Sequence, residues 1–252
     1  MATGAMVATS QPTATATALQ ILRRGGNAMD AAVAASAVLC VTEPLSTGIG
    51  GDCFLLYHEA AAGKLHALNG SGRAPGRATP NAVRGQGMTE VPERGILSVT
   101  VPGAVDAWQA AVERFGTLDL GALLQPAIEY AEAGFAVTPV VASDWQRQAG
   151  LLRQSADSAR SYLVDNRAPV VGSRHCFPDL ARSLRLIAGQ GKDAFYRGPL
   201  AEEIVRFSHA HNGLLELDDF ASHRSEWVEP VAGDYRGLTI FEVPPNSQGI
   251  TA

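Results

Sequence analysis

The chain has 252 residues, of which 46% are hydrophobic, and it carries a formal net charge of -5 at pH 7. That length and composition suffice for a sizeable hydrophobic core, in one large domain or two small ones. Because the net charge is negative and no long basic run occurs, the composition argues against nucleic acid and membrane surfaces as partners.

Three cysteines, Cys40, Cys53 and Cys176, lie far apart and form no Cys-x-x-Cys pair. Their number and spacing favour reduced, buried thiols over a disulfide framework or a zinc site. His209 and His211 alternate in a polar segment, a pattern more typical of a solvated turn than of a metal site. We therefore expect neither a metal ion nor another cofactor.

Arg23-Arg24 precedes an apolar run that ends in Val-Leu-Cys at 38–40 and superficially resembles an export leader. Asp30 interrupts the run, and Leu39 stands where a lipoprotein cleavage site needs a small residue. The run is also shorter than the roughly 20 apolar residues that span a bilayer. The expected compartment is the cytoplasm, or the periplasm if the N-terminus is incomplete.

The first elements are a short strand and two helices. Alternation over Met6–Pro12 predicts an opening strand. A helix over Ala14–Arg24 is expected to end at Gly25-Gly26. Asn27 then caps a second helix, rich in Ala and Val, which continues to Thr42.

A glycine-rich loop with Gly48, Gly50 and Gly51 follows within Glu43–Tyr57 and leads into a strand. A phosphate-binding loop runs in the order strand, glycines, helix, whereas the order here is reversed and no Gly-Lys-Ser/Thr ending follows. Close packing of the backbone under a sheet is therefore the preferred interpretation of these glycines.

Cys53–His58 and Lys64–Asn69 predict a hairpin with its turn at Gly63. Ser71–Val91 shows no periodicity, which predicts a long loop on the surface or lining a site. Ile96–Val101 predicts a further strand.

The remaining pattern is mostly helical. Helices are predicted over Ala104–Phe115, Leu118–Ala133, much of 140–186, Leu200–Ala210 and Leu217–Phe220, with a turn over Gln190–Arg197. Trp227–Val243 alternates well enough for two strands, with turns at Gly233-Asp234 and Arg236-Gly237.

Several short motifs occur along the chain from the first helices to its last residues. They are Gly25-Gly26-Asn27-Ala28, Asp30-Ala31-Ala32-Val33-Ala34, Glu43-Pro44, Ser46-Thr47-Gly48-Ile49-Gly50-Gly51, Val101-Pro102-Gly103, Gln125-Pro126-Ala127, Asp193-Ala194-Phe195-Tyr196-Arg197-Gly198, Gly233-Asp234-Tyr235-Arg236-Gly237 and Pro244-Pro245-Asn246-Ser247-Gln248-Gly249. Together these motifs resemble the large-subunit region of γ-glutamyltranspeptidases. They fall in that family's order, and the resemblance covers nearly the whole chain.

The resemblance implies an α+β fold, part of the four-layer αββα sandwich of N-terminal nucleophile hydrolases, with an additional helical region. The sheet-and-helix core would comprise about 1–135 and 225–252, and the helical region about 136–224. In this family a proenzyme cuts itself, and the strands of the large subunit pair with those of the small subunit. The chain would then be incomplete without that small subunit.

The resemblance also implies an activity. A threonine hydroxyl attacks an amide carbonyl, its own α-amino group serves as the base, and the acyl-enzyme passes to water or an amine. The expected substrates are γ-glutamyl amides such as glutathione. Since that threonine begins the small subunit, no catalytic residue is expected in this chain. The alternatives are a family amidohydrolase for a different small acyl amide, or a non-catalytic binding fragment.

The family places an arginine, which grips the α-carboxylate of the substrate, at the first position of an Arg-Glu-x-Ala-Pro segment. Here the segment reads Ser71-Gly72-Arg73-Ala74-Pro75, so that a neutral donor stands where the family has a cation. Charge-assisted hydrogen bonds are roughly twice as strong as neutral ones. Ser71, Gly72 and Arg73 are the candidate substrate-binding residues, and the alternative for Arg73 is an ordinary solvated loop arginine.

Overall fold

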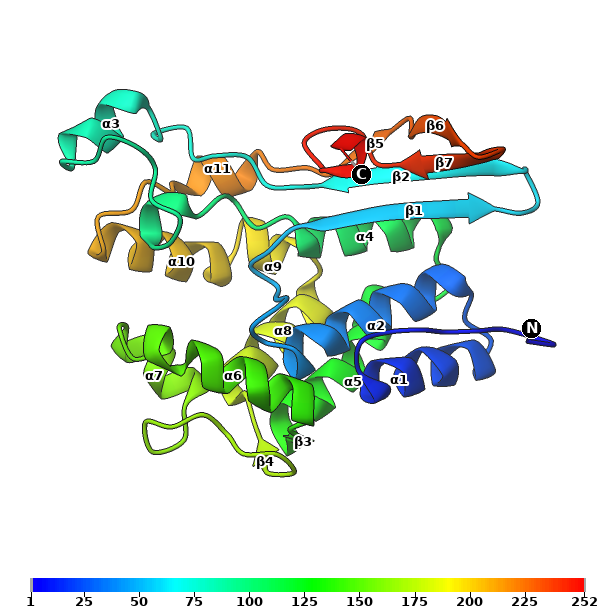
Figure 1. The fold of residues 1–252 in the computed structure, drawn as a ribbon, viewed down its shortest axis with the longest axis horizontal. Helices are drawn as coiled ribbons and strands as arrows, with labels where there is room; N and C mark the ends of the chain where they lie inside the picture. Colours follow the sequence, from blue (N-terminus) through cyan, green and yellow to red (C-terminus); the bar gives the residue numbers. More distant parts are fainter. Residues whose placement is uncertain (1, 252) are drawn as a thin grey trace. The chain divides into compact units, whose positions relative to one another are not determined.

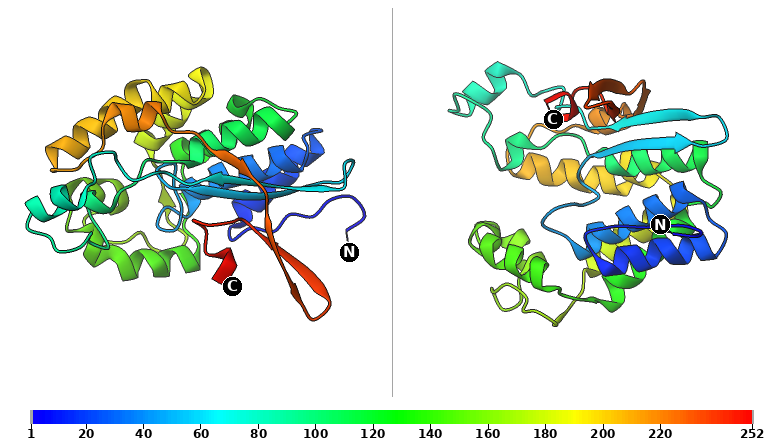
Figure 2. Two further views of the ribbon diagram at one scale, coloured as in Figure 1. Left: turned by 90° about the horizontal axis from the view of Figure 1, so that it is seen from above. Right: turned by 45° about the vertical axis from the view of Figure 1, so that its right-hand side comes forward.

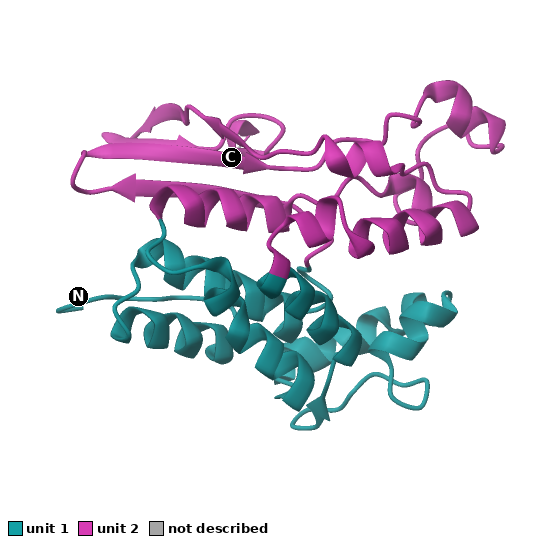
Figure 3. Ribbon diagram, turned by 180° about the vertical axis from the view of Figure 1, so that it is seen from behind, with its two compact units in different colours: residues 1–48, 116–189 teal, residues 49–115, 190–252 magenta. Residues whose placement is uncertain are grey.

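A computed structural model describes residues 2–251 and separates the chain into two compact units (Figure 3). Unit 1 comprises Met1–Gly48 and Gly116–Gly189, and unit 2 comprises Ile49–Phe115 and Gln190–Ala252. The predicted grouping of 1–135 with 225–252 concerns the layers of the whole protein and stays a prediction.

Unit 1 is mainly helical. Its elements are α1 (Pro12–Arg23), α2 (Ala28–Thr42), α5 (Leu120–Ala133), β3 (Phe135–Ala136), α6 (Pro139–Leu152), α7 (Ala156–Tyr162), β4 (Arg174–His175) and α8 (Pro178–Gln190). α2 packs against both α1 and α5 (Figure 1). A helix that is apolar around most of its circumference belongs in a core, and α2 is buried along most of its length.

The start of α2 is fixed by a capping box. Asn27 Oδ1 accepts hydrogen bonds from the backbone N–H groups of Met29 at 2.9 Å and Asp30 at 3.0 Å. In return, Asp30 Oδ2 accepts from the Asn27 N–H at 2.8 Å. These bonds satisfy N–H groups that the first turn of a helix leaves without partners. The predicted cap at Asn27 is confirmed.

Asp30 also ties α2 to the turn before α5. Its side chain is fully buried and accepts hydrogen bonds from the Thr117 N–H at 3.0 Å, the Thr117 hydroxyl at 2.6 Å and the Leu118 N–H at 3.3 Å. Burial alone raises the pKa of Asp30, but these hydrogen bonds outweigh it and lower the pKa below its usual value. The carboxylate is therefore ionised and satisfied by neutral donors.

Unit 2 contains a three-stranded antiparallel sheet in the order β1-β2-β5 and a separate hairpin of β6 and β7. Its elements are β1 (Cys53–Glu59), β2 (Lys64–Gly70), α3 (Pro80–Gly85), η1 (Ile96–Ser98), α4 (Ala104–Phe115), α9 (Asp193–Tyr196), α10 (Pro199–Ala210), α11 (Leu217–Ala221), β5 (Glu226–Val228), β6 (Val231–Tyr235), β7 (Leu238–Glu242) and η2 (Gly249–Thr251). Figure 2 shows the β6–β7 hairpin, in orange to red, extending away from the β1–β2 pair.

α4 covers one face of β1 and β2 (Figure 1). Its buried side chains include Val105, Trp108 and Val112, which recur at the three- and four-residue spacing of one helix face. Leu68 of β2 is likewise fully buried. Burial of a large apolar side chain contributes about 1.5–3 kcal/mol, so this layer is the main support of the sheet.

The register of the sheet sets the position of the loop that follows β2. β1 and β2 pair from Glu59 opposite Lys64, next to a turn where Gly63 has a φ of 61°, to Cys53 opposite Gly70. β2 and β5 pair with Asn69 opposite Glu226. The residues after β2 therefore emerge beside the first residue of β5.

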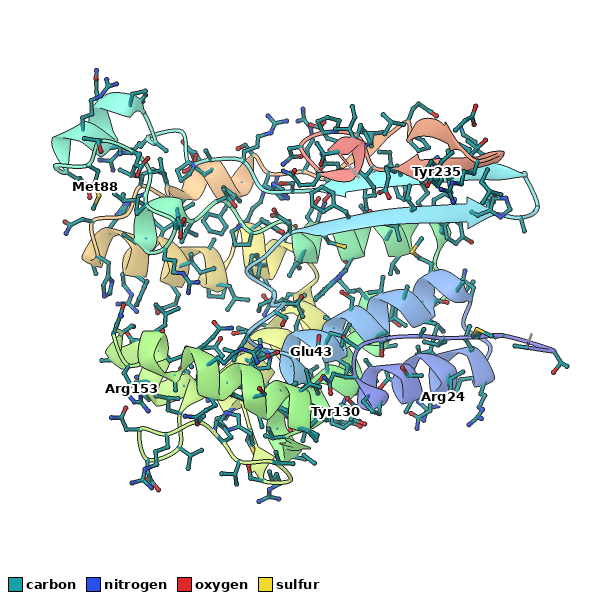
Figure 4. All side chains as sticks on the ribbon, in the orientation of Figure 1. Arg24, Glu43, Met88, Tyr130, Arg153 and Tyr235 are labelled. Carbon is teal, nitrogen blue, oxygen red and sulfur yellow. The ribbon has the colours of Figure 1, made fainter. Side chains whose placement is uncertain are left out.

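Hydrophobic side chains remain exposed on β1 and on the β6–β7 hairpin. Burial alternates along β1, and Phe54 and Leu56 face outward. Leu238 and Ile240 of β7 are exposed as well, together with Tyr235 at the end of β6 (Figure 4). Contiguous exposed apolar side chains are typical of surfaces that contact another polypeptide.

The helices predicted in unit 1 and the first hairpin are confirmed, but two predicted strands are wrong. Met6–Ser10 is extended and pairs with no strand among residues 2–251, and α1 begins directly at Pro12. Within Ile96–Val101 the chain forms the short helix η1 instead of a strand. Alternation alone does not make a strand, because a strand also needs a partner for its backbone hydrogen bonds.

Two further predictions differ in detail. The loop predicted over Ser71–Val91 contains α3, where Thr79 Oγ1 accepts a hydrogen bond from the Ala82 N–H and Pro80 occupies the first turn. Gly233-Asp234 lies within β6, and the turn of the hairpin is at Arg236-Gly237. Within the described part of the chain, no helix is long and apolar enough to cross a membrane.

Candidate substrate-binding site

The loop after β2 packs backbone to backbone against Val101–Gly103. A Cβ atom on Gly72 would lie 1.4 Å from the carbonyl oxygen of Val101, and one on Gly103 would lie 1.9 Å from that of Gly70. The Val101 N–H also donates a hydrogen bond of 3.0 Å to the Arg73 carbonyl. Only glycine permits this approach, which fixes the position of the candidate residues.

The close backbone packing predicted for the glycine loop 48–51 is found instead at Gly72 and Gly103. A Cβ atom on Gly48 or on Gly50 would meet nothing within 4 Å, and nothing in the structure explains a glycine at either position. The Gly51 carbonyl accepts hydrogen bonds of 2.9 Å from the N–H groups of Gly103 and Ala104 at the start of α4. The loop thus holds the start of α4 through the Gly51 carbonyl.

Ser71 is held by hydrogen bonds on two sides. Its hydroxyl donates to Asp52 Oδ2 at 3.1 Å, and the Gly72 N–H donates to Asp52 Oδ1 at 2.9 Å. The amide of Asn246 donates to the Ser71 hydroxyl at 2.7 Å. A hydroxyl has one proton to donate, and Ser71 donates it to Asp52.

Asn69 completes this network at the end of β2. Its side-chain carbonyl accepts from the Ser71 N–H at 3.0 Å, and its side-chain amide donates to Oδ1 of the Asn246 side chain at 2.9 Å. Asn246 comes from the Pro-Pro-Asn-Ser-Gln-Gly motif near the end of the chain. The network therefore joins two of the motifs that carry the family resemblance.

Arg73 pairs with the first residue of β5. Its Nη2 donates a hydrogen bond of 2.7 Å to Glu226 Oε1, and both side chains are at least half exposed. An exposed ion pair of this kind contributes about 0–1 kcal/mol to stability. Glu226 nevertheless neutralises the positive charge that Arg73 brings to the site.

These residues line a polar hollow of about 360 Å³. Its walls are formed by Asn69, Ser71, Gly72, Arg73, Ala74, Arg224, Glu226 and Asn246. The structure thus brings together all three residues predicted from the sequence. It adds Asn69, Ala74, Arg224, Glu226 and Asn246. Of these, Ala74 and Asn246 belong to segments recognised in the sequence. The lining contains two arginines and one glutamate, and the carboxylate of Asp52 lies beside Ser71 and Gly72, so the formal charges at the hollow balance.

A buried ion pair lies beside the hollow. Asp106 of α4 is almost fully buried and accepts hydrogen bonds from Lys192 Nζ at 2.7 Å and from the Ser225 N–H at 2.6 Å. Burial acts to raise the pKa of Asp106, but the bonds from Lys192 and Ser225 outweigh it and lower the pKa. Asp106 therefore stays ionised and anchors the backbone at the start of β5.

Tyr196 supports the same segment. Its hydroxyl donates to the Pro102 carbonyl at 2.8 Å and accepts from the Asp106 N–H at 3.1 Å. The ring of His223 stacks on Tyr196 with centroids 5.3 Å apart. Burial lowers the pKa of His223, so the imidazole is neutral near pH 7.

A second hollow, of about 280 Å³, adjoins this ion pair. It is lined by Asp106, Lys192, Asp193, Tyr196, Arg197, Ala221, Ser222, His223 and Arg224. Arg224 thus lines both hollows. No local sequence pattern marks Arg224, because its position depends on Asp106 and Tyr196, which are distant in the sequence.

The chain is similar to known proteins over most of its length. The family model described as Gamma-glutamyltranspeptidase matches residues 14–252. The chain is 42% identical to the "Glutathione hydrolase-like YwrD proenzyme" of Bacillus subtilis (strain 168), over 92% of this chain and 44% of that protein. It is 39% identical to the "Acylase ACY 1 proenzyme" of Pseudomonas sp. (strain SE83), over 97% of this chain and 46% of that protein.

The fold also matches solved structures. The crystal structure of Helicobacter pylori gamma-glutamyltranspeptidase superposes with a TM-score of 0.93 and 32% identity, over 99% of this chain and 72% of that one. The chain spans less than half the length of the two curated relatives, at 44% and 46%. With matches of this extent, the chain belongs to the gamma-glutamyltranspeptidase family of N-terminal nucleophile hydrolases, and it corresponds to the large-subunit region.

Proposed function

We propose that this chain is the large-subunit part of an autoprocessed amidohydrolase or acyltransferase that cleaves γ-glutamyl amides such as glutathione. Membership of the family supports this proposal, and so do the relatives named as proenzymes. The nucleophilic threonine belongs to the remainder of the protein, as the resemblance implies. The role of the present chain is then to bind and orient the acyl group.

The polar hollow at the end of β2 is the observation that carries the proposal. Its lining combines two arginines with neutral hydrogen-bonding groups on Asn69, Ser71 and Asn246. That combination suits a small acyl group that bears a carboxylate. A charge-assisted hydrogen bond contributes about 1.5–3 kcal/mol, which corresponds to roughly tenfold to a hundredfold in specificity.

The chemistry divides between the two parts of the protein. The threonine oxygen adds to the amide carbonyl, the amine leaves with a proton, and water or a second amine then attacks the resulting ester and restores the hydroxyl. Ser71, Gly72 and Arg73 line the hollow in which the acyl group would lie during both steps. None of them has a reacting role.

The partner in this proposal is the small-subunit part of the same proenzyme. Phe54, Leu56, Leu238 and Ile240 supply exposed apolar surface in unit 2. The segment Met6–Ser10, which pairs with no strand in the described part of the chain, supplies a backbone edge in unit 1. Strand edges and apolar surfaces of this kind are normally covered in a folded protein. The expected cytoplasmic or periplasmic compartment stays a prediction.

One observation favours the alternative, a different small acyl amide. Ser71 takes the place of the family arginine, and its hydroxyl donates to the carboxylate of Asp52. A substrate carboxylate at that point would meet a negative charge instead of a cation, and like charges at close range repel. The acyl carboxylate would then bind elsewhere in the hollow, which suits an acid with a spacing different from that of glutamate.

The whole protein should be expressed from its gene, and its fragments weighed by mass spectrometry before and after addition of γ-glutamyl 4-nitroanilide or glutathione. We expect two fragments, a threonine at the new N-terminus, and transient addition of the acyl group to the smaller fragment. A protein that remains uncut would contradict the proposal. So would a cut protein that takes up no acyl group and releases no amine, which would indicate the non-catalytic alternative.

A further inference from the structure

Arg224 has an anchored backbone and a free side chain. On one side of it, His223 stacks on Tyr196, and on the other, the Ser225 N–H donates to the buried carboxylate of Asp106 at 2.6 Å. The Arg224 side chain itself is exposed and lines both hollows. Among residues 2–251, no hydrogen bond or ion pair of its guanidinium group is found. An arginine presents five donors in a rigid fork, and here all five remain available.

The other candidates in the hollow are already engaged. The positive charge of Arg73 faces Glu226 at 2.7 Å. The hydroxyl proton of Ser71 is donated to Asp52 at 3.1 Å. Arg224 is therefore the arginine of the lining that has no ionic partner among residues 2–251. This assignment differs from the sequence-based expectation, which considered only Ser71 and Arg73.

We propose that Arg224 binds the carboxylate of the substrate's acyl group and thereby determines acyl specificity. This inference rests on the proposed amide hydrolysis and identifies the substrate class, namely monoamides of short dicarboxylic acids. The planar guanidinium binds a carboxylate through two parallel hydrogen bonds. Asp52 repels an anion from the Ser71 side, so the carboxylate lies on the side of Arg224.

The fixed backbone distinguishes Arg224 from an ordinary surface arginine. An exposed arginine normally loses side-chain and backbone freedom when it binds a ligand, and this loss weakens binding. At Arg224 the backbone is already held by Tyr196 and Asp106 through its two neighbours. Asp106 and Lys192 are accordingly positioning residues, since they act on the substrate only through the segment that carries Arg224.

The test uses the processed whole protein and a matched pair of substrates. Glutaryl and pentanoyl 4-nitroanilide have acyl chains of equal length, but only glutaryl carries a distal carboxylate. We expect Arg224→Ala to lower kcat/KM for the glutaryl substrate by about tenfold to a hundredfold, mainly through KM. The pentanoyl substrate should change by less than about twofold, as for other surface substitutions. Arg224→Lys should restore part of the loss.

Two matched variants serve as controls. Arg73→Ala removes the neighbouring arginine of the same hollow, and we expect a smaller loss because Glu226 already neutralises its charge. Arg206→Ala removes an exposed, paired arginine on α10 that lines neither hollow, and we expect no change. Equal losses on both substrates for Arg224→Ala would overturn the inference. So would a charge preference that disappears with Arg73→Ala but persists with Arg224→Ala.

A binding measurement separates this inference from the proposed function. Calorimetry should show that the processed protein binds glutarate more tightly than pentanoate, and that Arg224→Ala removes this difference. If that result is found but no amide is cleaved, the proposed hydrolysis fails and the role of Arg224 stands. If amides are cleaved while Arg224→Ala leaves the preference for glutarate unchanged, the role of Arg224 fails and the hydrolysis stands.

Discussion

The two units each contain a buried aspartate in the first turn of a helix, but they satisfy it differently. Among residues 2–251, Asp30 in unit 1 accepts hydrogen bonds from neutral groups alone, those of Asn27, Thr117 and Leu118. Asp106 in unit 2 pairs with the ammonium group of Lys192 and accepts a bond from the Ser225 N–H. Both carboxyls have pKa values below the usual range, in each case because hydrogen bonds outweigh the effect of burial.

The two aspartates hold different parts of the molecule in place. Asp30 ties a helix start to a turn, and its contacts are local to the helical layer of unit 1. Asp106 holds the segment that precedes β5, and Arg224 projects from that segment into the hollow. A charged pair is more sensitive to the loss of one member than a set of neutral donors, because the remaining charge is left without compensation. The following variants test this contrast.

The largest effect is expected for Asp106→Ala. It leaves Lys192 without a partner and the Ser225 N–H unsatisfied, which should lower the free energy of unfolding by about 3 kcal/mol. Hydrogen exchange followed by mass spectrometry should show faster exchange at the start of β5. The double variant Asp106→Leu with Lys192→Met, which removes both charges, should recover part of the loss. No recovery would contradict the role assigned to the charge pair.

Asp30→Ala should have the next largest effect. It removes the acceptor for the Thr117 and Leu118 groups and breaks the capping box, at a cost of about 1.5–3 kcal/mol. Asp30→Asn keeps one acceptor oxygen and should cost less. Chemical unfolding with hydrogen exchange as the readout would place the loss at α2 and the start of α5. If instead the two substitutions cost the same, the hydrogen bonds do not carry the stability.

Gly72→Ala should disturb unit 2 where the backbone approach is closest. Its Cβ atom would lie 1.4 Å from the Val101 carbonyl oxygen, so the loop must shift, at a cost of about 1–3 kcal/mol. Gly50→Ala is the matched control, since its Cβ atom meets nothing within 4 Å. Thermal unfolding should show a change of less than about 0.5 kcal/mol for this control. A larger loss for Gly50→Ala than for Gly72→Ala would refute the packing described for the loop.

The smallest expected effect is the pH dependence of the free energy of unfolding, which also distinguishes Asp30 from Asp106. Because both folded-state pKa values lie below the ordinary aspartate pKa of about 3.9, each carboxylate stabilises its unit above that pH and loses this contribution as the pH falls further. Added salt should weaken the contribution of Asp106, whose partner Lys192 is partly exposed, more than that of Asp30. The free energy of unfolding, measured between about pH 2 and pH 5 at low and at high salt, reports the contributions of both aspartates. If the free energy of unfolding depends equally on salt in Asp30→Asn and in Asp106→Asn, the two aspartates do not differ in the way described.

Much of the fold follows from local signals. Asn27 and Asp30 predict their helix start from spacing alone, and Gly63 marks the turn of the first hairpin. Met6–Ser10 and Ile96–Val101 alternate like strands, but no local pattern shows whether a partner strand exists.

The site was predicted only in part, because tertiary contacts leave no local pattern in the sequence. Ser71, Gly72 and Arg73 lie within one short motif, so a resemblance to the family points to them. Arg224 belongs to no motif, and its position arises from contacts with Asp106 and Tyr196 more than 20 residues away, of the kind that only the folded chain brings together. The sequence places Arg224 just before the strand β5. That this strand pairs with β2 at Asn69, and so brings Arg224 to the hollow, is visible only in the folded chain.

The most direct test of the account is the substrate preference of the processed wild-type protein. The central claim is that the hollow formed by Ser71, Arg73 and Arg224 selects acyl groups that carry a carboxylate. We predict that kcat/KM is at least about tenfold higher for glutaryl than for pentanoyl 4-nitroanilide, as expected for one charge-assisted contact. Comparable kcat/KM values for the two substrates would contradict the claim.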